Sequence, residues 1–204
     1  MTEKPIIFST KMVQAILSGR KTQTRRVMKV QPSTQDHKFL TVLDTTARNA
    51  RLIRGKHHWA KLTADSCRLL DSSVYFSSPY GYVEERLWVR ESFALSNNKC
   101  FYKANFEDED ITTWKPAIHL PRSFSRITLE ITKLRIQRLN DITEEEAIAE
   151  GCTGLHLQRL DKPQQFLPPV EHFAHVWDKI NSKRGFSWAT NPYVWVIEFR
   201  RVEV

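Results

Sequence analysis

One segment of this 204-residue chain constrains its fold more than any other, because apolar and polar side chains alternate along it. Residues 125–139 follow this period of two, which predicts a long, half-buried β-strand. The alternation slips by one residue near 132–133, and such a slip is typical of a β-bulge. The chain must therefore build a sheet around this strand. The apolar positions are Ile127, Leu129 and Ile131 before the slip, and Leu134 and Ile136 after it.

Shorter apolar segments predict the strands that accompany it. Their lengths and irregular connections favour a small barrel or an α+β sheet over a doubly wound fold. We therefore expect an α+β fold that is mainly β, with helices at its edges. The predicted short strands cover residues 5–8, 22–30, 86–90, 99–104 and 193–199.

Three helices are predicted from capping residues and apolar spacing. Ser9 or Thr10 caps the first, and Gly19 suits its left-handed end. Thr143 and Glu146 form a capping box for the second, which Gly151 ends. Pro168-Pro169 begins the third. Its apolar face carries Phe173, Val176, Trp177 and Ile180, and we expect Trp177 and Trp195 to lie in the core.

We expect a single domain over residues 1–204 with an insertion at about 32–83, where no regular pattern is found. The formal net charge is +8, and residues 1–61 alone carry 13 Lys/Arg against 3 Asp/Glu, a net of +10. The remaining residues then hold 18 basic and 20 acidic residues, a net of −2. This asymmetry indicates a polyanionic partner such as RNA. Basic residues of the insertion fit either phosphate contacts or a solvated loop; they are Arg48, Arg51, Arg54, Lys56 and the pair His57-His58.

The three cysteines are widely spaced and form neither a disulfide framework nor a CxxC pair, which predicts a reduced, cytoplasmic protein. No apolar run is long enough to cross a membrane, and the N-terminus lacks a signal-peptide core. His172 and His175 stand three apart on the third helix without an evident third ligand. We therefore predict no metal and no cofactor.

The segment 19–27, with the sequence GRKTQTRRV, concentrates cations and hydroxyls around one glycine. Unpaired charge is costly to bury, so such a segment is suited to meeting phosphate or a polar nucleotide. Its polar side chains are those of Arg20, Lys21, Thr22, Thr24, Arg25 and Arg26.

Segment 8–26 resembles the signature of ASCH domains, a PUA-like β-barrel family associated with RNA. Segments 86–91, 125–130 and 195–199 resemble the larger, phage- and prophage-associated branch of this family. The resemblance covers most of residues 5–30, 86–104, 114–151 and 170–202, and it implies a PUA-like small β-barrel with peripheral helices. The insertion matches nothing in the family.

Small bacterial members of the family hydrolyse the acetyl amide of N4-acetylcytidine with a lysine, a threonine and a glutamate. The resemblance carries these roles to Lys21 as base, Thr24 as nucleophile and Glu150, which would position the amide. Glu144, Glu145 and Glu146 lie near enough to Glu150 to leave the last assignment open.

A lysine acts as a base only when neutral, which requires about 4 kcal/mol of pKa perturbation. The positive charges of the neighbouring arginines lower the pKa of Lys21 and so favour its neutral form. Residues 21 and 24 of a regular strand would point to opposite faces. Lys21 and Thr24 can therefore act together only if Lys21 lies in the turn after Gly19.

The ligand would be a nucleoside or RNA, in a cleft of the barrel that we expect Lys21, Thr24, Arg26 and Glu150 to line. Further residues are expected to contact it. These are Arg20, Thr22, Arg25, Arg26, Trp88, Arg90 and Arg126, with Tyr102 and Trp114 as further stacking candidates. The resemblance also admits a non-catalytic RNA-binding module and a ribonuclease. The residues alone do not separate these functions from the amidohydrolase, and they leave the oligomeric state open.

Overall fold

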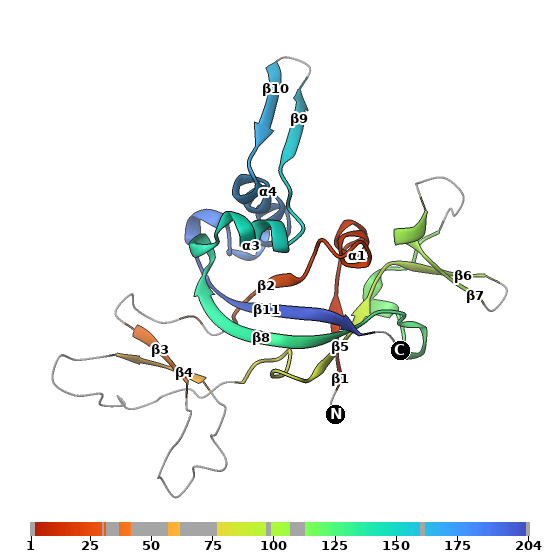
Figure 1. Ribbon diagram of the computed structural model, residues 1–204, viewed down its shortest axis with the longest axis horizontal. Coiled ribbons are helices and arrows are strands. Elements are labelled where there is room, and N and C mark those ends of the chain that lie inside the picture. Colours follow the sequence, from red (N-terminus) through yellow and green to blue (C-terminus); the bar gives the residue numbers. More distant parts are fainter. Residues whose placement is uncertain are drawn as a thin grey trace, which may run out of the picture.

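The centre of the fold is a five-stranded sheet with the strand order β1-β5-β8-β11-β2 (Figure 1). The computed structural model describes residues 3–29, 31, 37–41, 57–61, 77–96, 99–106, 113–159 and 162–202. Strands β1 and β5 run parallel, and the other neighbours are antiparallel. The strands are β1 (Glu3–Ile7), β2 (Gln23–Val27), β5 (Arg86–Arg90), β8 (Thr128–Arg138) and β11 (Tyr193–Val202).

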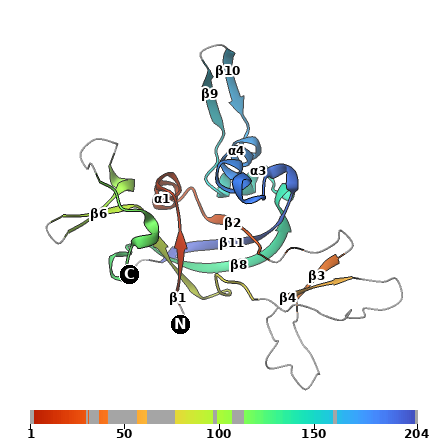
Figure 2. The ribbon, with the colours of Figure 1, turned by 180° about the vertical axis from the view of Figure 1, so that it is seen from behind.

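Strands β8 and β11 form the longest pairing of the sheet and confirm the predicted bulge. Glu198 pairs with Lys133, but the next residue, Phe199, pairs with Ile131. Thr132 is therefore the extra residue on β8, at the place where the alternation slips. A bulge bends a strand and increases its twist, and both strands curve strongly beneath the helices (Figures 1 and 2).

The mixed α+β class is confirmed, with more strands than helices. In the described part of the chain, β1 pairs only with β5 and β2 only with β11, so these pairings do not close the sheet. The curvature nevertheless brings the two edges together. The Arg26 guanidinium on β2 donates a hydrogen bond of 2.5 Å to the Ile7 carbonyl at the end of β1.

The helices α1 (Thr10–Leu17), α3 (Glu144–Ala149) and α4 (Pro169–Asn181) lie on one side of the sheet (Figure 1). The predicted caps are confirmed: the Ser9 hydroxyl accepts a hydrogen bond from the backbone N–H of Met12, and Thr143 and Glu146 form a capping box. Gly19 (φ 74°) and Gly151 (φ 90°) have the left-handed backbone that ends α1 and α3.

The two faces of β11 contribute to two apolar clusters. Trp195 and Ile197 belong to the cluster that includes α1, while Val194 and Val196 pack with α3 and α4. The terminal strand is thus buried on both faces, as its sequence predicts, and Trp195 lies in the core.

Three two-stranded sheets lie outside the central sheet. They are β3 (His37–Thr41) with β4 (His57–Lys61), β6 (Phe93–Ser96) with β7 (Lys99–Tyr102), and β9 (Leu155–Arg159) with β10 (Lys162–Leu167). The sequence does not predict β9 and β10, because their alternation is weak.

Two of the hairpin strands, β3 and β4, fall inside the predicted insertion. Its basic residues 48–56 and Cys67 lie outside the described residues. Short 3₁₀ helices complete the fold; they are Lys103–Asn105, Ala117–His119, Arg122–Phe124, Leu139–Asp141, Ser182–Arg184 and Trp188–Thr190.

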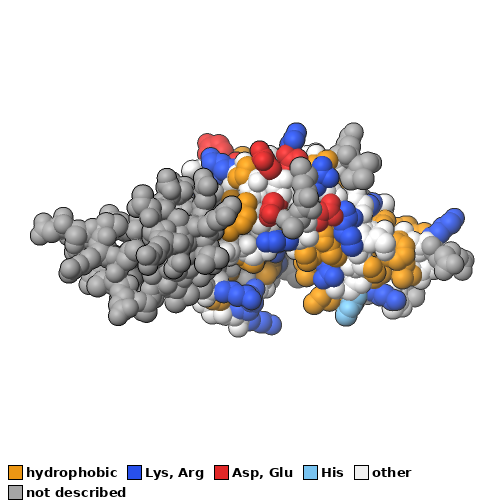
Figure 3. Space-filling view, turned by 90° about the horizontal axis from the view of Figure 1, so that it is seen from below, with side chains coloured by type: hydrophobic (Ala, Val, Ile, Leu, Met, Phe, Trp, Pro, Cys, Tyr) orange, Lys and Arg blue, Asp and Glu red, His pale blue; other side chains and the backbone are white. Residues whose placement is uncertain are grey.

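Among the residues coloured in Figure 3, Lys and Arg are scattered between hydrophobic and acidic side chains. The described cations of this face therefore do not form one basic patch or a continuous track for a nucleic acid.

Candidate active site

Lys21 lies in the turn between α1 and β2, which is the geometry that its predicted role requires. Its backbone N–H donates to the Ala15 carbonyl, and that of Thr22 donates to the Ala149 carbonyl. Because β2 begins only at Gln23, Lys21 is not subject to the alternation of the strand. The turn also joins the end of α1 to the end of α3.

The Lys21 side chain is fully buried and forms an ion pair with Glu150. Its Nζ donates to the Glu150 Oε2 at 2.7 Å and to the Glu150 backbone carbonyl at 2.8 Å. Glu150 is the C-cap of α3 and is itself only 6% exposed. The carboxylate that meets Lys21 is therefore Glu150, and not one of the glutamates of the first turn of α3.

Burial lowers the pKa of Lys21, while the negative charge of Glu150 acts in the opposite direction. The positive charge of Arg26 adds to the lowering. Burial likewise raises the pKa of the neighbouring Cys152 thiol to about 11, so this cysteine stays protonated and is a poor nucleophile.

Glu150 also connects Lys21 to a longer network of ion pairs. Arg25 lies 3.4 Å from Glu150 and 2.6 Å from Glu146, and Arg135 contacts both Glu146 and Glu198. The charges alternate in sign and sum to zero, which offsets the cost of burying each of them. In order, the network is Lys21, Glu150, Arg25, Glu146, Arg135 and Glu198.

A cavity of about 140 Å³ opens beside Glu150, between β2 and α4. One wall is polar and the other is aromatic and aliphatic, an arrangement that suits a flat, polar ring. The polar wall carries Thr24, Arg25, Arg26 and Glu150, and the apolar wall carries Phe173, Val176, Trp177 and Ile180 from α4.

The predicted catalytic residues come together at this cavity, although not all of them line it. Thr24 and Glu150 are lining residues, but Lys21 is not. The expectation that Lys21 itself lines the cleft is corrected, because its ammonium group is fully buried and bonded to Glu150. Lys21 is therefore connected to the cavity only indirectly, by its ion pair with Glu150.

Of the other predicted ligand contacts, only Arg25 and Arg26 line the cavity. Arg20 and Thr22 are exposed, and the Arg20 Nε donates to the Ser18 hydroxyl. Trp88 is a core residue with 8% exposure. The Arg90 guanidinium lies 4.7 Å from the centre of the Trp88 ring, so this pair packs away from the cavity.

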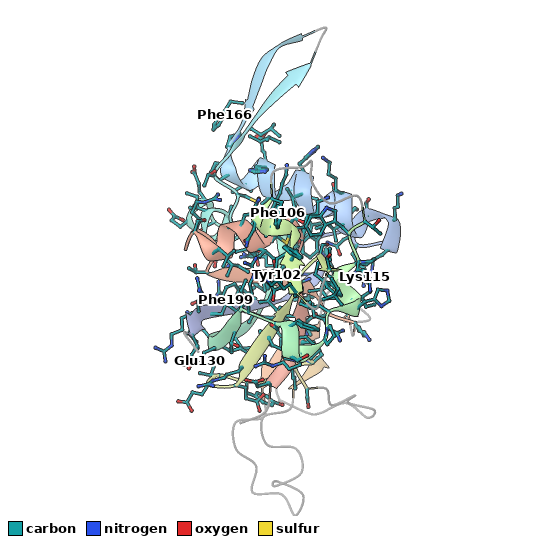
Figure 4. The ribbon with its side chains drawn as sticks, turned by 90° about the vertical axis from the view of Figure 1, so that its right-hand side faces the viewer. Tyr102, Phe106, Lys115, Glu130, Phe166 and Phe199 are labelled. Carbon is teal, nitrogen blue, oxygen red and sulfur yellow. The ribbon has the colours of Figure 1, made fainter. Side chains whose placement is uncertain are left out.

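Arg126 does not line the cavity either, because its guanidinium group contacts other side chains. It forms two hydrogen bonds of 2.9 Å with the buried Glu91 carboxylate, and it lies 4.1 Å from the centre of the Tyr102 ring. Trp114 packs against Phe106 nearby. Tyr102 and Phe106 lie in the body of the molecule, apart from Phe166 on the projecting β9–β10 hairpin (Figure 4).

Sequence reasoning did not identify several residues that line the cavity, among them Tyr80 and Arg184, and it assigned the apolar face of α4 a different role. Tyr80 and Arg184 line the cavity, but Tyr80 falls within the predicted insertion and Arg184 follows the last helix. The apolar face of α4 was expected to serve only as core, yet it also forms the cavity wall. Periodicity identifies such a face but does not say what covers it.

Within the described part of the chain, no group of three or more His, Cys, Asp and Glu side chains is placed to hold a metal ion. His172 and His175 accordingly have no such set of partners there. None of the described helices is long and apolar enough to span a membrane. Comparisons with family models, with curated proteins and with solved structures found no match to this chain.

Proposed function

We propose that this protein is a PUA-like ASCH protein that binds a cytidine-type base in the cavity and hydrolyses its N4-acyl amide. The observation that carries the proposal is the buried Lys21–Glu150 pair behind a cavity that Thr24 lines. A nucleophile, a base of lowered pKa and a positioned carboxylate are the groups that amide hydrolysis needs. The contact between Arg26 and Ile7 across the sheet edges supports the barrel-like fold of this family.

The size of the cavity favours a single base. Its volume of about 140 Å³ is below the roughly 300–1,000 Å³ of pockets that enclose drug-sized ligands. A pyrimidine ring can stack on the aromatic side chains of α4, with its polar edge toward Glu150 and Thr24. The sugar would then remain at the opening.

In the proposed reaction, the Thr24 hydroxyl attacks the carbonyl carbon of the acetyl amide. Neutral Lys21 accepts the hydroxyl proton, with Glu150 relaying and orienting the transfer. The C–N bond breaks, the proton passes to the departing N4 amine, and the acetyl group remains as an ester on Thr24. Water then hydrolyses the ester to acetate.

A non-catalytic RNA-binding module is the second candidate. The excess of positive charge in residues 1–61 favours it, since phosphate contacts dominate the affinity of such modules. Arg25 and Arg26 at the cavity fit both functions.

The experiment is to incubate the purified protein with N4-acetylcytidine and to measure cytidine release. We expect turnover by the natural chain and a loss of about 10²–10⁴-fold in Lys21→Ala and in Thr24→Val. Arg20→Ala and Thr22→Val are matched controls, because these exposed neighbours do not line the cavity. Circular dichroism checks that each variant is folded. An inactive natural chain that binds RNA in a salt-sensitive manner would support the module instead.

A further inference from the structure

Three segments that are distant in the sequence bring Arg26, Tyr80 and Arg184 to the same cavity. Arg26 comes from β2, Tyr80 from the segment that precedes β5, and Arg184 from the 3₁₀ turn after α4. None of the three belongs to the proposed catalytic group. Their side chains supply two guanidinium groups and one hydroxyl.

Neither Arg26 nor Arg184 forms an ion pair with a carboxylate of the described residues. Arg26 donates to the Ile7 carbonyl and lies 5.0 Å from the centre of the Phe8 ring. Arg184 donates only a long hydrogen bond of 3.5 Å to Asn181. These contacts leave the positive charge of both guanidinium groups uncompensated.

The charge of Glu150, the carboxylate that lines the cavity, acts on Arg26, but the two groups do not form an ion pair. Glu150 is already paired with Lys21 and with Arg25. Tyr80 lies within electrostatic range of both arginines. Burial raises the pKa of its hydroxyl, and the positive charges of Arg26 and Arg184 act against that rise. The hydroxyl is therefore a protonated donor beside two positive charges.

The residues that line the cavity differ in how deeply they are buried. Glu150, Phe173 and Trp177 are each buried, Arg26 and Tyr80 are half-buried, and Arg184 is exposed. The buried end suits a base, and the exposed end carries the uncompensated cations. An anionic group of the ligand would consequently lie at the mouth.

We infer that the ligand of this cavity carries a phosphate group, bound at the mouth by Arg26 and Arg184 with the Tyr80 hydroxyl. A phosphate has enough oxygens to accept from two guanidinium groups and a hydroxyl together, and guanidinium groups match its geometry. This inference rests on the proposed function and makes the substrate a nucleotide, either free or within an RNA strand. A nucleoside would leave both cations without an anion.

The test measures binding by calorimetry with cytidine, with cytidine 5′-monophosphate and with a short single-stranded RNA containing cytidine. We expect the monophosphate to bind at least about tenfold more tightly than cytidine. This factor corresponds to the smallest usual contribution of one hydrogen bond to a charged group. Arg184→Gln should remove most of this advantage, and Tyr80→Phe should reduce it in part. Lys183→Gln is the matched control, since Lys183 is exposed and does not line the cavity.

Equal affinities for cytidine, its monophosphate and the RNA would overturn the inference and leave the proposed site standing. A loss in Lys183→Gln as large as that in Arg184→Gln would overturn it as well, because general charge would then explain the binding. Tight binding of the monophosphate with no hydrolysis of N4-acetylcytidine 5′-monophosphate would support the inference and reject the enzyme. If the RNA alone shows the Arg184-dependent gain, the phosphate is that of a polymer. Absence of binding to all three probes would reject both the phosphate site and the proposed nucleoside-binding cavity.

Discussion

A buried lysine is stable only when its charge is compensated or removed, and Lys21 shows how Glu150 meets this requirement. The carboxylate accepts from the Lys21 ammonium at 2.7 Å, and the Glu150 backbone carbonyl accepts a second hydrogen bond. Glu150 stands in the last turn of α3, where a negative charge opposes the helix dipole. Its position is explained by Lys21 and Arg25, and not by the needs of the helix.

Replacing Lys21 by methionine should therefore destabilise the protein strongly. Removal of one partner of a buried ion pair costs about 3–5 kcal/mol, because the other charge remains buried. Urea denaturation of Lys21→Met measures the cost, and Arg20→Met is the control with an expected change within about 0.5 kcal/mol. A loss for Lys21→Met no larger than that of the control would contradict the compensation argument.

The lowered pKa of Lys21 also predicts how stability depends on pH. The unfolded chain binds a proton at this lysine up to about pH 10.4, whereas the folded chain releases it at lower pH. Between the two pKa values the unfolded state holds more protons, so stability rises with pH. The unfolding free energy of the natural chain minus that of Lys21→Met should increase as the pH approaches 10.4. A difference that decreases over this range would mean that Glu150 raises the pKa instead.

At the scale of elements, α3 connects helix capping to the site. The Glu146 carboxylate accepts from the backbone N–H of Thr143 and also forms an ion pair with Arg25 at 2.6 Å. Burial alone would raise the pKa of Glu146, but the Thr143 N–H, Arg25 and Arg135 lower it overall. A cap that is recognisable in the sequence thus also holds a member of the ion-pair network.

Thr143→Ala should lower the unfolding free energy by about 0.5–2 kcal/mol, the usual cost of losing an N-cap. The Thr143 hydroxyl accepts from the Glu146 N–H at 3.3 Å, and alanine leaves that donor without its cap. Thermal denaturation measures the change, and Thr143→Ser should retain most of the stability because it keeps the hydroxyl. Equal losses in both variants would show that the methyl group matters more than the cap.

At the scale of the whole molecule, one side chain links the two edges of the curved sheet. Arg26 on β2 donates to the Ile7 carbonyl of β1, at the far end of the strand order. The bulge at Thr132 lies on a central strand of this sheet and contributes to its curvature. Edge strands are otherwise the least protected part of a sheet.

Arg26→Met should accordingly loosen β1 more than the centre of the sheet. Loss of a hydrogen bond from a charged donor costs about 1.5–3 kcal/mol, and amide hydrogen exchange should accelerate mainly in β1. Arg201→Met, an exposed substitution near the end of β11, is the control. A uniform acceleration across β8 and β11 would show that Arg26 stabilises the whole fold and not the edge contact.

The local features could be predicted from the sequence, because their causes lie within a few residues. The bulge near Thr132, the caps at Ser9 and Thr143, and the position of Lys21 after Gly19 all follow from short-range patterns. The mixed α+β class follows from the same patterns summed along the chain.

The folded structure was needed to identify the carboxylate that contacts Lys21, because that contact joins residues 129 positions apart. It also decided that Trp88 and Arg126 pack locally while Tyr80 and Arg184 reach the cavity. Residue type predicts that a cation will find a partner, but the path of the chain selects the partner. The apolar face of α4 illustrates this difference: its spacing predicted the helix, whereas the fold placed part of that face at the cavity.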